Sequence, residues 1–256
     1  MCSPTHRLRV ILVRHGESQN NLYSEISIKA FQENRVCDPS ISDRGQQQAQ
    51  STADYLGKGG NQILGGIDEI HVSPMKRTLQ TAAPIAAALP TVPVQVFTDI
   101  HEISGVYDGT VGKPGMTRSQ MQSGFPTYTL PESLTEKGWY TLDSPESYSQ
   151  GQQRCRKVWE RLCAMADGLT QDRCILMVVH GDFTDSLLQA AFGVMQQPPN
   201  NNSNANSEKI WVFPTWNTAI TALDIRSGDK RPTLLFHNSI AHLPPELVKF
   251  DKLGRC

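Results

Sequence analysis

The segment 14–18, which reads Arg-His-Gly-Glu-Ser, carries the residue types in this chain best suited to chemistry, and it directly follows the apolar run 8–13. An apolar, β-branched run that stops at a polar turn containing glycine predicts a buried strand that ends at a pocket. Ligands of open α/β sheets bind just beyond the carboxyl ends of the strands. The pair Arg14 and His15 therefore indicates an anion site that contains a nucleophile.

Other strand ends carry similar side chains. Arg77 opens a predicted helix just beyond the run 67–72, Glu102 follows the run 94–100, and His180 with Gly181 follows the run 174–179. Because the carboxyl ends of parallel strands share one edge of a sheet, we expect these groups to lie close to Arg14 and His15. A lone histidine or arginine at a strand end is usually structural, but several in matching positions favour a functional cluster.

The expected cluster suits a phosphoryl group, whose negative charge is spread over several oxygen atoms. The planar guanidinium groups of Arg14 and Arg77 match these oxygen atoms bidentately. A helix that begins near Arg77 or after Gly181 adds backbone N–H donors and the positive end of its dipole. A neutral imidazole at His15 can attack phosphorus in line with the leaving oxygen, which gives a phosphohistidine that water later hydrolyses.

The leaving oxygen needs a proton, and Glu102 is the candidate donor. Three other carboxyl groups could serve instead: Glu17, Asp99 and Asp182. Catalysis of this kind depends on positioning and charge stabilisation, and the six cysteines lack the short paired spacing of a zinc site. We therefore expect neither a metal ion nor a cofactor.

The elements that must position these groups alternate along the chain. Strand-like runs occur at 8–13, 67–72, 94–100, 174–179, 218–225 and 233–236. Between them, helical spacing of apolar residues predicts a helix over 75–89, and Ser144 before Pro145 predicts the N-cap of another helix that continues to about 169. The pattern predicts an α/β fold, a three-layer α/β/α sandwich around a largely parallel central sheet.

Two segments interrupt this alternation. The segment 103–143 is rich in glycine and proline, which predicts an irregular lid insertion over the C-terminal edge of the strands. Residues 196–207 are dominated by Asn, Ser, Pro and Gln and predict a flexible loop. The length of 256 residues fits one large α/β domain with an insertion, and we expect a single domain over 1–256.

Charge and composition argue against several classes of partner. The chain has 24 Lys and Arg against 25 Asp and Glu, a net charge of −1, which disfavours broad binding of nucleic acid or of an anionic membrane surface. No apolar run approaches the ~20 residues that span a bilayer, and residues 1–6 lack the apolar core of a signal peptide. We expect a cytoplasmic protein with no nucleic-acid or membrane partner. The sequence leaves its oligomeric state undefined.

As an ordered set, the motifs resemble those of the histidine phosphatase superfamily, in its phosphoglycerate-mutase-like branch. They are the segments 12–18 with Asn21, 42–49, 73–82 and 178–181, and the resemblance spans residue 8 to about 243. The resemblance implies His15 as the phosphorylated nucleophile, Arg14, Arg77 and His180 as the phosphate pocket, Asn21 as an auxiliary phosphate ligand and Glu102 as the proton donor. Gly181 stands where the acid-phosphatase branch has an Asp, which leaves Asp182 as a fallback acid.

The activity within this family depends on the insertion. True mutases carry an arginine-rich insertion, whereas 103–143 offers only Arg118, Lys113 and Lys137 as basic groups, together with Trp139 and Tyr140. These side chains could equally serve only to pack the insertion. We predict a phosphatase that hydrolyses small phosphate monoesters, with a phosphoglycerate-type mutase as the alternative. A second alternative is a catalytically idle relative that binds a phosphorylated ligand or a protein partner, although a binder would not need both a nucleophile and an acid.

Overall fold

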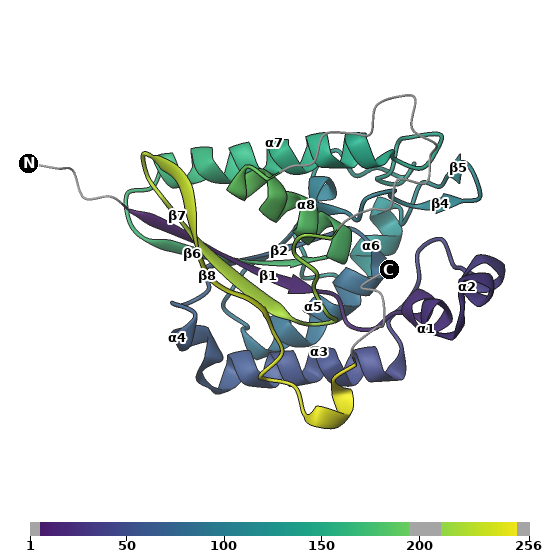
Figure 1. The fold of residues 1–256 in the computed structure, drawn as a ribbon, viewed down its shortest axis with the longest axis horizontal. Coiled ribbons are helices and arrows are strands. Elements are labelled where there is room, and N and C mark those ends of the chain that lie inside the picture. The colour runs from purple at the N-terminus through teal and green to yellow at the C-terminus, as the bar shows by residue number, and fades with distance from the viewer. Residues whose placement is uncertain (1–5, 195–210, 250–256) are drawn as a thin grey trace, which may run out of the picture.

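A six-stranded sheet forms the middle layer of the structure, a computed structural model that describes residues 6–194 and 211–249 (Figure 1). The strand order is β3-β2-β6-β1-β7-β8. The parallel strands are β1 (Arg7–Arg14), β2 (Glu69–Val72), β3 (Val94–Val96) and β6 (Arg173–Val179). The loop predicted at 196–207 lies outside the described residues.

The remaining two strands run differently from the expected parallel pattern. β7 (Ile220–Arg226) pairs antiparallel with β1, and β8 (Asp229–Ser239) pairs antiparallel with β7. Residues 227–228 are the whole connection between β7 and β8, and a crossover to a parallel neighbour needs a dozen residues or more. The sheet is therefore parallel except at this edge.

Helices cover both faces of the sheet, so the predicted three-layer architecture is confirmed (Figure 1). One face packs against α3 (Asp43–Tyr55), the π-helical turn Leu56–Gly60, α4 (Asn61–Ile63) and α5 (Lys76–Ala88), and the other against α7 (Tyr148–Asp167) and α8 (Gly181–Phe192). Alternate side chains of β1 supply the two cores: Ile11 and Val13 on the first face, Leu8, Val10 and Leu12 on the second.

Two predicted boundaries are wrong. The strand predicted over 94–100 ends at Val96, and Thr98–Ile100 forms a 3₁₀ turn, because β2, the neighbouring strand of β3 in the sheet, ends at Val72. The helix predicted to start at Ser144 starts at Tyr148 instead. Its N-cap is Ser147, which shares a reciprocal capping box with Gln150, whereas Ser144 has no Glu or Gln three positions later.

The insertion 103–143 lies beyond the C-terminal end of β1, at the same end of the molecule as α1 (Gln19–Ile26) and α2 (Ile28–Asn34) (Figure 1). It contains the short hairpin of β4 (Tyr107–Asp108) and β5 (Val111–Gly112) and one helix, α6 (Arg118–Gly124). Trp139 and Tyr140 are buried beside His101, and Arg118 donates to backbone carbonyls within the insertion. These side chains therefore pack the insertion.

The last short element is a 3₁₀ turn at Pro245–Leu247, which packs near α3. Among the described helices, none combines the length and the apolar character needed to cross a membrane.

Candidate active site

His15 follows the last residue of β1 and is fixed by the backbone around it. The backbone N–H of His15 donates to the carbonyl oxygen of Val179, the last residue of β6, at 2.9 Å. A Cβ atom on Gly16 would lie only 2.5 Å from the carbonyl oxygen of Gly45, and one on Gly45 only 2.1 Å from that of Glu17. Glycine is required on both sides of this contact between the turn and the start of α3.

The His15 side chain is held in one tautomer. Its Nδ1 lies 2.7 Å from the carbonyl oxygen of Gly16, and because a carbonyl oxygen only accepts, Nδ1 carries the proton. Nε2 is buried and has no hydrogen-bond partner among the described residues. Burial, and then the positive charges of Arg77 and Arg14, lower the pKa of His15 well below its usual range. The ring is therefore neutral near pH 7, with the Nε2 lone pair available to an electrophile.

A second buried histidine, His180, lies next to His15, with ring centroids 5.3 Å apart. Its Nε2 is 2.6 Å from the hydroxyl oxygen of Ser73, while its Nδ1 is buried without a partner in the part of the chain that the structure describes. Burial, and then the charge of Arg77, lower the pKa of His180 well below its usual range. If Ser73 donates its hydroxyl hydrogen to Nε2, the ring proton is on Nδ1, where it can be donated to a ligand.

Two buried arginines supply positive charge around the histidines. Arg14 is the last residue of β1, and its guanidinium group donates to the carbonyl oxygen of Thr215. Arg77 is the second residue of α5, whose first N–H, that of Lys76, donates to the Asp38 carboxylate at 3.0 Å. Burial raises the pKa of Asp38, although the nearby Arg77 acts in the opposite direction. Asp38 thus caps α5 beside Arg77.

Asn21 lies in the first turn of α1, and its side-chain oxygen is already engaged. Oδ1 accepts the backbone N–H and the hydroxyl of Ser18, both at 2.9 Å, and the side-chain amide of Asn217 at 3.4 Å. The amide nitrogen of Asn21 is therefore the group that it can offer to a ligand.

Glu102 binds the N-terminus of α8 through its carboxylate. Oε1 accepts the N–H of Phe183 at 2.9 Å and that of Ile103 at 3.0 Å, and Oε2 accepts the N–H of Asp182 at 3.3 Å. His180 is the N-cap residue of this helix and Gly181 its first residue. The free N–H groups and the dipole of a helix start favour a carboxylate there. One helix start thus brings Glu102 and His180 to the same place.

A cavity of about 100 Å³ lies at this end of the sheet. His15, Asn21, Arg77 and Glu102 line it, whereas Arg14, His180 and Gly181 are buried deeper and do not line it. The sequence predicts that these seven residues converge. Four of them line the cavity. The other three lie next to His15 or Glu102, in sequence or in space.

The four candidate acids divide into two groups. Glu102 and Asp182 both line the cavity. Glu17 instead pairs with Arg44 at 3.1 Å, and the Asp99 side chain is 58% exposed at the surface; neither lines the cavity. Position therefore favours Glu102 or Asp182 as a proton donor.

Phe31, Arg35 and Tyr107, which lie outside the strand ends, also line the cavity, and we call them the leaving-group wall. The Arg35 guanidinium carbon lies 3.6 Å from the centroid of the Tyr107 ring, and Nη1 donates to the Tyr107 carbonyl oxygen at 2.6 Å. No described carboxylate lies within ion-pair distance of Arg35. This arrangement leaves a positive charge on the leaving-group wall.

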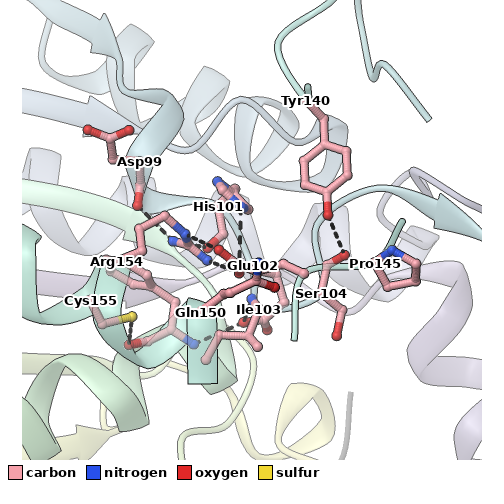
Figure 2. A network of polar contacts seen from close by, with 12 residues as sticks. Asp99, His101, Glu102, Ile103, Ser104, Tyr140, Pro145, Gln150, Arg154 and Cys155 are labelled. Carbon is pink, nitrogen blue, oxygen red and sulfur yellow. Dashed lines mark hydrogen bonds and ion pairs between the residues drawn. The ribbon is translucent and has the colours of Figure 1, made fainter. Parts of the chain in front are cut away.

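Three supporting residues were missed at the level of sequence: Ser73, Asp38 and Arg154. Arg154 belongs to a polar network around Glu102 that Figure 2 shows. Ser73 opens a motif segment, but its partner His180 is 107 residues away. The spacing of Glu146 and Arg154, eight residues, is compatible with two helical turns and was the one available signal.

Among residues 6–194 and 211–249, no group of three or more His, Cys, Asp or Glu side chains is arranged to hold a metal ion. Three of the described cysteines, Cys155, Cys163 and Cys174, are buried, and burial raises the pKa of Cys155 and of Cys174 to about 12. These two thiols are protonated near pH 7. The groups at the cavity are therefore a neutral imidazole, guanidinium groups and carboxyl groups, which can bind and transfer a phosphoryl group.

Comparison with known proteins agrees with this geometry. The family model of the histidine phosphatase superfamily (branch 1) matches residues 10–238. A Schizosaccharomyces pombe protein named as a probable phosphatase is 24% identical over 222 residues, which are 85% of this chain and 87% of that protein. Phosphoserine phosphatase 1 of Hydrogenobacter thermophilus is 37% identical over 81 residues, 32% of each chain.

Solved structures show the same fold. Mycobacterial glucosyl-3-phosphoglycerate phosphatase superposes with a TM-score of 0.55 at 20% identity, over 91% of this chain and 100% of that chain. The family match covers most of the residues that the motifs single out, from β1 to β8. The chain belongs to the histidine phosphatase superfamily.

Proposed function

We propose that this protein hydrolyses small phosphate monoesters in two steps, through a phosphohistidine at His15. One observation carries the proposal: a neutral imidazole with its proton fixed on Nδ1 lies at a cavity that Arg77 and Glu102 also line, and its Nε2 has no hydrogen-bond partner within 6–194 and 211–249. An unprotonated ring nitrogen is the form of histidine that can attack phosphorus.

In the first step, the Nε2 lone pair of His15 forms a bond to phosphorus as the ester P–O bond breaks. Arg77 and the amide of Asn21 bind the phosphoryl oxygen atoms, and Arg14 adds positive charge from below the surface of the cavity. Nδ1–H of His180 is a further donor, next to the His15 ring. The Glu102 carboxyl group gives its proton to the leaving oxygen, so the alcohol departs neutral.

In the second step, the Glu102 carboxylate takes a proton from a water molecule that attacks phosphorus. The bond between phosphorus and His15 breaks, the electron pair returns to Nε2, and inorganic phosphate is released. Glu102 is protonated again and His15 is neutral again, so one cycle consumes one ester and one water. Asp182 lines the same cavity and is the alternative acid.

The comparisons favour a phosphatase over a mutase, because the named relatives are phosphatases. The structure offers a consistent feature: none of the basic residues of the insertion, Arg118, Lys113 or Lys137, lines the cavity. The related proteins' names point to substrates such as phosphoserine and glucosyl-3-phosphoglycerate. We infer that the substrate here is also a small phosphorylated molecule.

The test is phosphate release from an aryl ester, an alkyl ester and phosphoglycerate, with His15→Ala and, as a matched control, His242→Ala. We expect turnover by the native protein and by His242→Ala, and a loss of at least about 10³-fold for His15→Ala. Isomerisation of phosphoglycerate faster than phosphate release would identify a mutase. No turnover over a broad panel would identify a phospho-ligand binder.

Glu102→Gln and Asp182→Asn decide between the two acids. Loss of the proton donor should slow the alkyl ester by about 10²-fold or more, whereas an aryl ester with a good leaving group needs little protonation. The variant that shows this difference identifies the acid.

A further inference from the structure

We propose that Arg154, held by Glu146, is the positioning residue that fixes Glu102 at the cavity. The inference rests on the proposed function, in which Glu102 protonates the leaving group. It assigns a role in the reaction to a side chain on α7 that does not line the cavity.

Arg154 uses both edges of its guanidinium group. Nη1 donates to the carbonyl oxygen of Asp99 at 2.7 Å and to that of His101 at 3.0 Å. Nε and Nη2 donate to the two carboxylate oxygens of Glu146 at 2.8 and 2.6 Å. Figure 2 shows this guanidinium group beside the backbone of Asp99 and His101, which leads to Glu102. The fork geometry locks the turn immediately before Glu102.

The ion pair between Arg154 and Glu146 is largely buried. The Arg154 side chain is 14% exposed and that of Glu146 is 6% exposed. Burial is the largest single influence and opposes the charge on Arg154, but the hydrogen bonds to Glu146 and the nearby negative charges together exceed it, so the pKa of Arg154 is raised. The negative charge of Glu102 acts in the same direction, which places the two groups within electrostatic reach. Arg154 therefore stays charged at any pH at which the enzyme works.

The backbone after Glu102 is tied to the same part of the molecule. The N–H of Glu146 donates to the carbonyl oxygen of Ser104 at 3.2 Å, and the Tyr140 hydroxyl also lies 3.2 Å from that oxygen (Figure 2). Ile103 packs so closely on α7 that a Cβ atom on Gly151 would lie 2.8 Å from its Cγ1. Both flanks of Glu102 are thus attached to the start of α7.

The Glu102 carboxylate itself binds the start of α8, as described above, and the hydrogen bonds of Arg154 hold the backbone at Asp99 and His101 just before it. Removing the guanidinium group frees the turn at 99–101 and lets the carboxyl group shift from the leaving oxygen. A displacement of ~1 Å can cost about 10²-fold in such a step. Because the phosphate end is untouched, the loss should appear only where the leaving group needs a proton.

The experiment compares Arg154→Met, Arg154→Lys and the native protein on alkyl and aryl phosphate esters. We expect Arg154→Met to lower kcat on the alkyl ester by about 10- to 100-fold, with less than about 3-fold change in KM and on the aryl ester. Arg154→Lys keeps the charge but not the fork, so it should recover part of the loss. Thermal midpoints of all variants show whether each is folded at the assay temperature.

The matched control is Arg161→Met. Arg161 also lies on α7 and pairs with the Asp99 side chain at 3.3 Å, but it is 41% exposed and donates to no backbone near Glu102. We expect it to leave both esters unchanged. If Arg154→Met does not fold, Glu146→Gln provides the test, because it keeps the shape of the pair and weakens its hold on Arg154. Equal losses on both esters, or equal effects of Arg154→Met and Arg161→Met, would overturn the proposal.

The double variant Glu102→Gln/Arg154→Met separates this inference from the proposed function. If Arg154 acts through Glu102, the double variant is no slower on the alkyl ester than Glu102→Gln alone. Multiplied losses would show that Arg154 acts independently and would reject the positioning role while leaving the phosphatase intact. Failure of the proposed function is recognised earlier, because the native protein would then release no phosphate from either ester.

Discussion

The two ends of the cavity are built differently. At the phosphate end, His15, Arg77 and His180 stand where buried strands end or helices begin, and they are almost completely buried. At the other end, the leaving-group wall comes from the short helix α2, the residue that follows it and the small hairpin of the insertion. The difference indicates that the sheet determines the reaction, whereas the connecting segments determine which substrate enters.

The two ends also differ in which parts of the fold their supporting hydrogen bonds join. Ser73 holds His180, and Gly16 holds His15, through short hydrogen bonds inside the core. In the leaving-group wall, Arg35 stacks on the Tyr107 ring and donates to the Tyr107 carbonyl oxygen, which joins two connecting segments. Substitutions at the phosphate end should therefore affect every substrate alike, and substitutions in the wall should affect substrates unequally.

Among the substitutions that test this contrast, the largest effect is expected at Arg77. Arg77→Met removes a guanidinium group that lines the cavity and faces the phosphoryl oxygen atoms in our mechanism, so kcat/KM should fall by about 10²- to 10³-fold for every ester. Steady-state kinetics over a panel of esters measure this. A loss that varied tenfold or more with the leaving group would show that Arg77 belongs functionally to the other end of the cavity.

A smaller uniform effect is expected at Ser73. Ser73→Ala removes the hydroxyl group 2.6 Å from Nε2 of His180, and we expect kcat/KM to fall by about 10- to 30-fold for all esters, because this contact then no longer holds the ring in one tautomer. Ser73→Thr, which keeps the hydroxyl group, is the control. Nitrogen NMR of the imidazole should show a mixture of tautomers in Ser73→Ala; an unchanged spectrum would contradict the assigned hydrogen bond.

Arg35 tests the leaving-group wall. Arg35→Met keeps most of the bulk over Tyr107 but removes the positive charge, so esters with an anionic leaving group should lose about 10-fold in kcat/KM relative to uncharged ones. Inhibition by inorganic phosphate should not change, because phosphate binds at the other end. Weaker inhibition by phosphate would show that Arg35 also contributes to phosphate binding, and would contradict the separation of the two ends.

The last prediction concerns stability and lies outside both ends. Burial lowers the pKa of His242 to about 4, whereas an unfolded histidine titrates near 6.5. Between these values the unfolded state binds a proton that the folded state does not, so the free energy of unfolding falls as the pH drops from about 6.5 towards 4. The slope is up to about 1.4 kcal/mol per pH unit for this group. Denaturant unfolding of His242→Gln over this range should show a shallower slope than the native protein; an identical slope would refute the assignment.

The sequence predicted strands and site residues correctly where a long buried apolar run ends in a polar residue. The buried runs at 8–13 and 174–179 predicted β1 and β6, and their polar ends predicted the positions of His15 and His180. The end of the run at 94–100 was predicted wrongly, because strand length depends on the short partner β2. Glu102 still reaches the cavity, but from a turn.

The sequence did not predict contacts between residues that are far apart along the chain. The hydrogen bond of Ser73 to His180 and those of Arg154 to the Glu102 segment join residues more than 50 positions apart. The pair Arg35 and Tyr107 joins two irregular segments whose path no periodicity predicts. Such contacts arise from the packed fold, and a single sequence contains no local pattern for them.

The most direct test of the account is to trap the intermediate. Mixing the native protein with a phosphate ester labelled in the phosphoryl group, stopping the reaction within milliseconds and digesting the protein should give label on the peptide that contains His15. That label should be lost in acid and kept in base, and Glu102→Gln should accumulate it from an aryl ester. Label that survives acid, or label on any other residue, would contradict phosphoryl transfer to His15.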